Sequence, residues 1–103
     1  MPLDRLKDKT TKENLWLYIL TLLKRKHMYA YEISEEIKKE FKFEIGTVTA
    51  YIILYKLENE GYVKTTWVLK DNRQRKYYEI TPDGTKILNN GVRYLKDLTR
   101  KLG

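Results

Sequence analysis

The sequence predicts a mainly α-helical domain with one small β-hairpin and a long C-terminal helix. The spacing of apolar residues supports this prediction. Apolar residues recur at helical spacing up to about residue 60, alternate with polar residues between 63 and 80, and return to helical spacing after 81. At 103 residues the chain has room for one compact core. We therefore expect a single domain.

Composition narrows the class of protein. Lys and Arg number 21 against 14 Asp and Glu, a net charge of +7, and cysteine is absent. Disulfides, thiolate zinc sites and cysteine nucleophiles are therefore excluded. The longest apolar stretch, Leu15–Leu23, is far shorter than the roughly 20 residues of a membrane span, and the first residues lack the apolar core of a signal peptide. We expect a basic cytoplasmic protein with an anionic partner and no membrane.

The first helix is preceded by a polar lead. Residues 1–12 are mostly charged or polar, so we expect this lead to be flexible or partly helical. Thr10 or Thr11 can cap a helix that begins at Glu13. The run Leu15–Leu23 is apolar nearly all round, which predicts a helix buried on more than one side.

Two further helices follow. The second is expected to open at Met28, and the third at Thr47 or Thr49, either of which can cap it. Gly61 is a typical residue just beyond a helix C-terminus. The stripe of the third helix that we expect in the core consists of Ala50, Ile53, Leu54 and Leu57.

The last third of the chain contains the hairpin and the terminal helix. Two β-prone runs, 63–70 and 75–80, flank a polar turn at 71–74. Thr81-Pro82-Asp83 is a helix start, with a capping hydroxyl, a proline in the first turn and an acid near the positive end of the dipole. Whether the helix continues through Asn89-Asn90-Gly91 is left open. The seam of this helix that we expect at a dimer interface comprises Leu88, Gly91, Val92, Leu95, Leu98 and Leu102. The alternative is a helix that folds back on its own core.

This order of elements describes a winged helix-turn-helix over residues 13–80, with 81–103 as a C-terminal dimerisation helix on the same domain. In that arrangement the third helix enters the major groove of double-stranded DNA and the hairpin, or wing, contacts the backbone. Between Lys64 and Lys76 five basic residues face one acidic residue. An ordinary solvated hairpin tip mixes both signs, so this imbalance favours a polyanionic partner.

Candidate DNA-binding residues follow from the same arrangement. Threonine hydroxyls can contact phosphates or base edges, and apolar groups can meet the thymine methyl. The third helix is close to neutral, so phosphate attraction is expected from the wing. An exposed Ile52 beside Tyr55 is equally consistent with a protein-facing surface. The candidates are Thr47, Thr49, Tyr51, Ile52, Tyr55 and Lys56 in the helix, and Lys70, Arg73, Arg75 and Lys76 in the wing.

Three segments match the motifs of a known family. The run 28–33 is similar to M-H-G-Y-E-I, and 49–63 parallels T-L-Y-P-A-L-x-R-L-E-x-E-G-L-I. The run 75–84 is close to R-K-Y-Y-x-I-T-x-x-G, the most specific match. On these motifs the sequence resembles the PadR-like winged-helix transcriptional regulators over residues 15–85. It departs from the family at Val48 and Ile52, where the family has Gly and Pro.

The resemblance implies a transcriptional repressor that binds a pseudo-palindromic operator as a homodimer, with half-sites about one helical turn apart. Some members of the family bind flat aromatic compounds at the dimer interface, which makes Trp16 and Tyr18 candidates for an effector pocket. The alternative is that these aromatic residues are simply core. An RNA-binding or protein-interaction winged helix remains a different class of function.

The residues do not favour catalysis, a cofactor or a metal. His27 is the sole histidine, which we expect at the end of the first helix as a cap. With no cysteine and no second histidine, a transition-metal site is disfavoured. There is no phosphate-loop spacing and no nucleophile motif around Ser34, the only serine.

Overall fold

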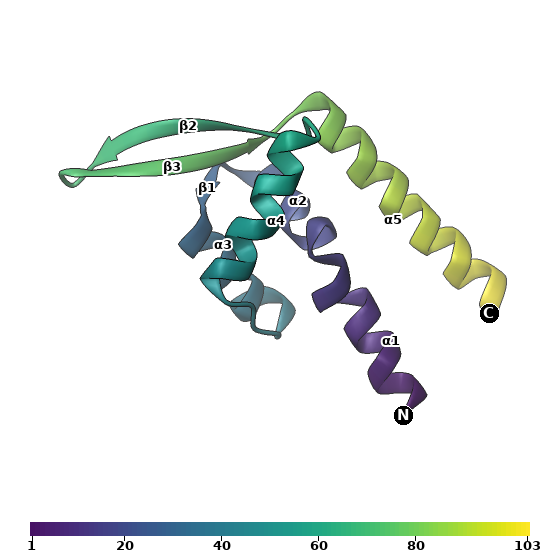
Figure 1. Cartoon of the computed structure of the whole chain (residues 1–103). Helices are drawn as coiled ribbons and strands as arrows, with labels where there is room; N and C mark the ends of the chain where they lie inside the picture. The colour runs from purple at the N-terminus through teal and green to yellow at the C-terminus, as the bar shows by residue number, and fades with distance from the viewer.

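A computed structural model describes the whole chain, residues 1–103. It contains ten segments of regular structure. They are α1 (Pro2–Thr10), a 3-10 turn (Lys12–Asn14), α2 (Leu15–Arg25), β1 (Met28–Tyr29), α3 (Ala30–Glu36), a π-helical turn (Ile37–Phe41), α4 (Thr47–Asn59), β2 (Val63–Lys70), β3 (Arg73–Ile80) and α5 (Pro82–Leu102). The β2–β3 hairpin projects from one side of the helices, and α1 and α5 extend from another (Figure 1). The predicted mainly helical winged fold is confirmed.

The core is built around α2. Five of its residues are buried, and it contacts α3, α4, α5 and β3 of its own chain. This explains why the run has no polar face, as a helix buried on several sides requires. The inward stripe of α4 is confirmed, because Ala50, Leu54 and Leu57 are buried and Ile53 is partly buried. The largest fully buried side chains are Ile19, Leu20, Leu22, Leu23, Ile33, Ile37 and Leu54.

Two predicted helix caps are wrong. Thr10 and Thr11 do not cap α2, because their hydroxyls donate backwards, to the carbonyl oxygens of Leu6 (2.8 Å) and Lys7 (2.6 Å). The polar lead is therefore a helix of its own, α1. The N-cap of α4 is Gly46, which places Thr47 and Thr49 inside the helix.

The second helix begins later than predicted because its first residues form a strand. Met28–Tyr29 pairs with β3 as β1, so α3 begins at Ala30. His27 does not cap the preceding helix. Its Nε2 lies 3.3 Å from Glu79 Oε1 on β3, while the backbone N–H of Lys26 donates to the Leu22 carbonyl. His27 and the residues of β1 therefore contact β3 and do not extend α2 or α3.

The hairpin is a regular antiparallel ladder from Val63↔Ile80 to Lys70↔Arg73. Its two turn residues, Asp71 and Asn72, have φ of 52° and 61°. A two-residue turn with positive φ at both positions matches the twist of the flanking strands, and Asp and Asn tolerate that conformation. The turn is therefore tighter than the predicted 71–74. Strand β3 lies in the middle of the sheet, in the order β1-β3-β2.

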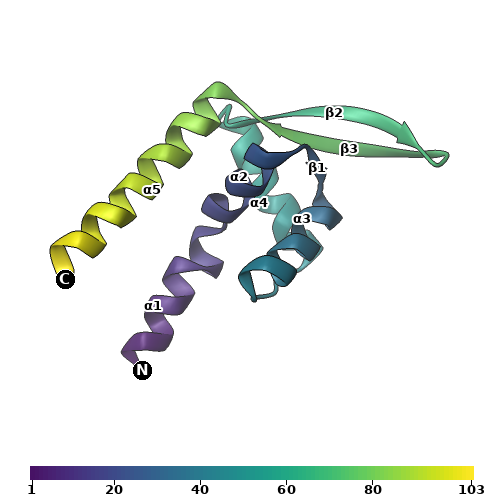
Figure 2. The same ribbon diagram turned by 180° about the vertical axis from the view of Figure 1, so that it is seen from behind.

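Helix α5 starts as predicted and is continuous through Gly91. The Thr81 hydroxyl accepts a hydrogen bond from the Gly84 N–H (3.0 Å) and donates to the Gly61 carbonyl (2.7 Å). A Cβ at Gly84 would lie 2.1 Å from the Tyr62 carbonyl oxygen, so only glycine fits there. From the back, α1 and α5 extend from the body with their free ends apart (Figure 2). None of the helices combines the length and the apolar character of a membrane span.

Candidate nucleic-acid interface and helix groove

One side of α4 is open to solvent. Ile52 is 52% exposed and Tyr55 64%, although both side chains are largely apolar. Five of the six residues predicted on this surface are exposed, and Thr47 is half-buried. The exposed five are Thr49, Tyr51, Ile52, Tyr55 and Lys56. The spacing of apolar residues therefore predicts correctly which side of α4 faces solvent.

The basic residues of the wing fall into two groups. Lys64 and Lys76 pair with carboxylates, at 3.7 Å from Glu79 and 3.5 Å from Glu58. Lys70, Arg73 and Arg75 form no ion pair within the chain, as the ion pairs all involve other residues. The free positive charge of the wing is therefore concentrated near its tip and along β3.

Lys76 links the wing to α4. Glu58 on α4 receives the Lys76 ammonium on Oε1 and a hydrogen bond from the Thr65 hydroxyl on Oε2 (3.2 Å). The Lys76 side chain is only 32% exposed and lies 5.6 Å from the centre of the Tyr78 ring. The pKa of the Tyr78 phenol is raised by burial and then by the charge of Glu58. The sequence predicts a phosphate contact for Lys76, whereas the structure pairs its ammonium with Glu58 of the same chain.

A notch of about 380 Å³ separates the wing from the start of α3 and α4. Tyr29, Tyr31, Tyr51 and Trp67 line it together with Arg73, Gln74, Arg75 and Lys76. Tyr29 and Tyr31 were not among the predicted residues. Tyr29 belongs to the two-residue strand β1, which is too short to show a periodicity, and Tyr31 lies in the first turn of α3. Only the pairing of β1 with β3 brings them beside the wing.

The expected dimer seam on α5 is divided between the inside and the outside of the chain. Leu88 is 3% exposed in the core of its own chain, so the prediction that it contacts a partner is wrong. Gly91 packs on α2, where a Cβ would lie 2.7 Å from Trp16 Cη2. The exposed part of the seam is Val92, Leu95, Leu98 and Leu102, the last 80% exposed.

A groove of about 590 Å³ runs between α1, α2 and α5. Its walls include both predicted pocket residues, Trp16 and Tyr18, and also Leu95 and Leu98 from α5. Tyr18 is engaged inside the chain, because its hydroxyl donates to the Thr10 carbonyl (2.5 Å). Its ring also meets the edges of Phe41 and Phe43, and burial raises its pKa.

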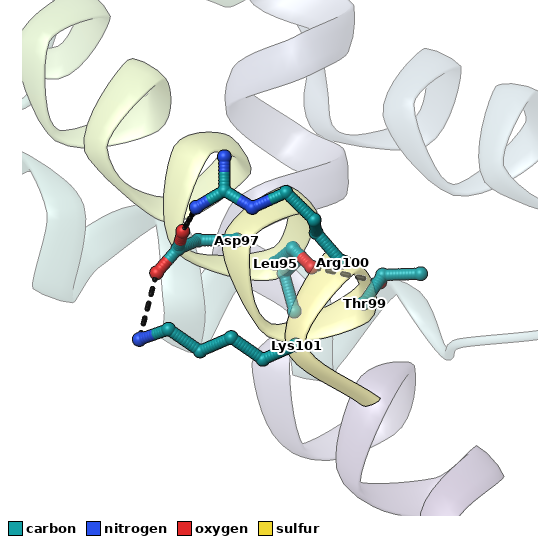
Figure 3. A network of polar contacts seen from close by, with 5 residues as sticks. All are labelled: Leu95, Asp97, Thr99, Arg100 and Lys101. Atoms are coloured by element: carbon teal, nitrogen blue, oxygen red, sulfur yellow. Dashed lines mark hydrogen bonds and ion pairs between the residues drawn. The ribbon is translucent and has the colours of Figure 1, made fainter. Parts of the chain in front are cut away.

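The polar contacts of α5 are local to the helix. Asp97 is paired with Arg100 and, at 3.1 Å, with Lys101, and the Thr99 hydroxyl donates to the Leu95 carbonyl (Figure 3). Pairs at three and four residues along a helix stabilise it without a partner. Asp97, Arg100 and Lys101 are thus paired within the helix, whereas the apolar side chains of Val92, Leu95, Leu98 and Leu102 remain exposed beside them.

Comparison with known proteins agrees with this geometry. The sequence pattern described as "Transcriptional regulator PadR-like family" matches residues 19–90. An uncharacterized protein X of Lysinibacillus sphaericus is 35% identical over 78 residues, which are 73% of this chain and 72% of that protein. A transcriptional regulator structure from Clostridium thermocellum is 30% identical with a TM-score of 0.77, over 96% of this chain and 93% of that one.

A further structure shows a relative with its ligand. Bacillus subtilis PadR in complex with operator DNA is 25% identical with a TM-score of 0.71. The match covers 76% of this chain and 45% of that one. With a family pattern over more than half of its length and the same fold as solved regulators, this chain belongs to the PadR-like family of transcriptional regulators.

Proposed function

We propose that this protein is a cytoplasmic repressor that binds a pseudo-palindromic operator in double-stranded DNA as a homodimer. Helix α4 enters the major groove, and the wing contacts the phosphate backbone of the DNA. The observation that carries the proposal is the notch, where Tyr51 of the exposed α4 surface lies beside Arg73 and Arg75 of the wing. One duplex can therefore meet both the helix and the free wing cations.

The two surfaces have different tasks in this proposal. Lys70, Arg73 and Arg75 attract phosphates, which is a contribution independent of base sequence. The α4 surface carries hydroxyl, aromatic and aliphatic groups and only one lysine, Lys56, so it suits base edges better than phosphates. Val48, 73% exposed, and Ile52 stand on that surface where the sequence departs from the Gly and Pro of the family motif, and they would set which bases are preferred.

The proposed dimer rests on two apolar stripes that the single chain leaves exposed. Leu95 and Leu98 of α5 line the groove and stay more than a third exposed, and Leu102 is largely exposed. Helix α1 has no buried residue although it carries Leu3 and Leu6. Full burial of one leucine contributes roughly 1.5–3 kcal/mol. A second copy that places its α5 against α1 and α5 would cover both stripes. The interface residues predicted from the sequence all lie on α5, and α1 is added to them by its exposed Leu3 and Leu6.

A small flat aromatic effector is a second proposal for the groove, beyond the dimer. The 590 Å³ volume lies within the range of ligand sites, and Trp16 offers a ring for stacking. Fluorescence of Trp16, read in a Trp67→Phe variant, should be quenched by a bound planar aromatic compound. Unchanged fluorescence across a panel of such compounds would count against the effector.

DNA binding is tested by fluorescence anisotropy with labelled duplex DNA and duplex RNA of one sequence. We expect tighter binding to DNA, because the deep, narrow major groove of RNA does not admit side chains of a helix. Equal affinity would favour the RNA-binding alternative. Failure to bind either duplex would favour a protein-interaction module.

The dimer is tested by sedimentation of the Leu95→Glu variant. A charge buried in the interface should convert the dimer to a monomer. Asn90→Glu, on the same helix at an exposed polar position, is the matched control and should remain dimeric. If Leu95→Glu sediments like the wild type, the proposed interface is wrong.

A further inference from the structure

Arg75 differs from the other free cations of the wing in how it is held. Its guanidinium carbon lies 4.3 Å from the centre of the Tyr29 ring, and it is half-buried. Lys70 and Arg73 are exposed and have no such contact. A cation over an aromatic face is attracted to it, so Arg75 has a restricted position before any ligand arrives.

The Tyr29 ring is itself fixed by the sheet. Tyr29 pairs with Tyr77 of β3, and the two rings meet edge to face at 5.4 Å. The Tyr29 backbone N–H donates to Glu32 Oε1 (3.2 Å) at the start of α3. Arg75 and Tyr77 are two residues apart on one strand and therefore share a face of the sheet. Strand β3 therefore holds both groups, because it contains Arg75 and pairs through Tyr77 with Tyr29.

The chemistry of the arginine follows from this contact. A guanidinium held over a ring by its cation–π contact still has its N–H groups to donate, and Arg75 uses none of them in an ion pair. Two parallel N–H groups match two oxygens of one phosphate. A contact made by a held side chain loses less conformational freedom on binding than one made by a mobile side chain.

We propose that Tyr29 is a positioning residue that presents Arg75 for a bidentate contact with one phosphate of the duplex and so sets the register of the wing. The inference rests on the proposed DNA-binding function. Lys70 and Arg73 attract phosphates by their charge, but no contact within the chain fixes the position of their side chains. Tyr29 itself touches no DNA in this scheme and acts through Arg75.

A double-mutant cycle on DNA affinity tests the coupling. Tyr29→Leu should weaken binding about two- to fivefold per protomer, the value of an exposed cation–π contact, and therefore about 5- to 30-fold for the dimer with its two copies. The slope of log affinity against log salt should stay the same, because no charge is lost. In an Arg75→Ala background, Tyr29→Leu should have no further effect. Tyr29→Phe, which keeps the ring, should bind like the wild type.

Tyr31→Leu provides the matched control for the cycle. Tyr31 lines the same notch and has no cation over its ring, so its effect should add to that of Arg75→Ala without coupling. Equal weakening by Tyr29→Leu with and without Arg75 would overturn the inference, since the ring would then have only a structural role. A wild-type protein that binds no duplex would overturn the proposed function and this inference together.

A phosphate scan gives a second readout. Methylphosphonate is placed at one position at a time in a duplex chosen by selection from a random pool. In the wild type, one position on each half-site should lose affinity strongly, and Arg75→Lys should lose that sensitivity because lysine has no planar fork. Tyr29→Leu should reduce the same single peak. A scan that is identical in the wild type and Tyr29→Leu would contradict the proposal.

Discussion

The separation of free and paired wing cations makes a quantitative prediction about salt. Arg73 forms no ion pair, whereas Lys76 is paired with Glu58 at 3.5 Å. Each phosphate neutralised contributes about 0.9 to the slope of log affinity against log salt. Because a dimer carries two copies, Arg73→Ala should reduce the magnitude of that slope by about 1.8. The double variant Glu58→Gln, Lys76→Met removes both ends of one internal pair and should leave the slope unchanged.

The assay is fluorescence anisotropy of one labelled duplex with each protein at a series of potassium chloride concentrations. The double variant is the matched control, because it removes a wing cation without changing the net charge. A slope reduced equally by both variants would show that Lys76 leaves Glu58 to bind phosphate in the complex. An unchanged slope in Arg73→Ala would refute the role of the wing as the backbone contact.

Three further predictions concern stability. Gly84→Ala should destabilise the fold by about 1–3 kcal/mol in thermal denaturation, because its methyl group meets the Tyr62 carbonyl; an unchanged melting temperature would contradict this packing. Leu88→Ala should cost about 2–5 kcal/mol of unfolding free energy in urea titrations, since Leu88 is buried within its own chain, and a loss under 1 kcal/mol would place it outside the core. Burial raises the pKa of Tyr78 in the folded state, so its contribution to stability is complete below the unfolded pKa of about 10 and is lost as pH rises through the higher folded value. Tyr78→Phe should weaken the alkaline decline of the melting temperature, and an identical decline would refute the assignment.

Local patterns explain most of what could be predicted from the sequence. The Thr81 cap, the inward stripe of α4 and the hairpin strands each depend on residues that are neighbours in the chain. Their signals are therefore readable without the fold. The outward surface of α4 follows from the same periodicity, which is why five of its six candidate residues are exposed.

The remaining features depend on contacts between distant segments. β1 exists because β3 offers it an edge, and two residues alone carry no strand pattern. Lys76 looks like any wing cation until Glu58, 18 positions earlier, is brought against it. Leu88 and Leu95 belong to one heptad pattern, yet only the packing of α2 on α5 decides that the first is core and the second exposed.

The N-terminal lead shows a different limit of prediction from the sequence. Its charged sequence predicts a flexible or partly helical segment, and the structure shows the helical alternative, with Pro2 in the first turn and Asp4 near the positive end of the dipole. α1 buries none of its own residues. The core of the single chain therefore does not explain why α1 is helical, and the proposed dimer would give its apolar residues a partner.

In the proposed complex, α4 and the wing of two symmetry-related chains contact one duplex. Selection of bound duplexes from a random pool tests this arrangement, because one experiment reports binding, symmetry and spacing. We expect enrichment of an inverted repeat with half-site centres about one helical turn apart, roughly 10 base pairs. No enrichment, or a single half-site without its inverted copy, would contradict it.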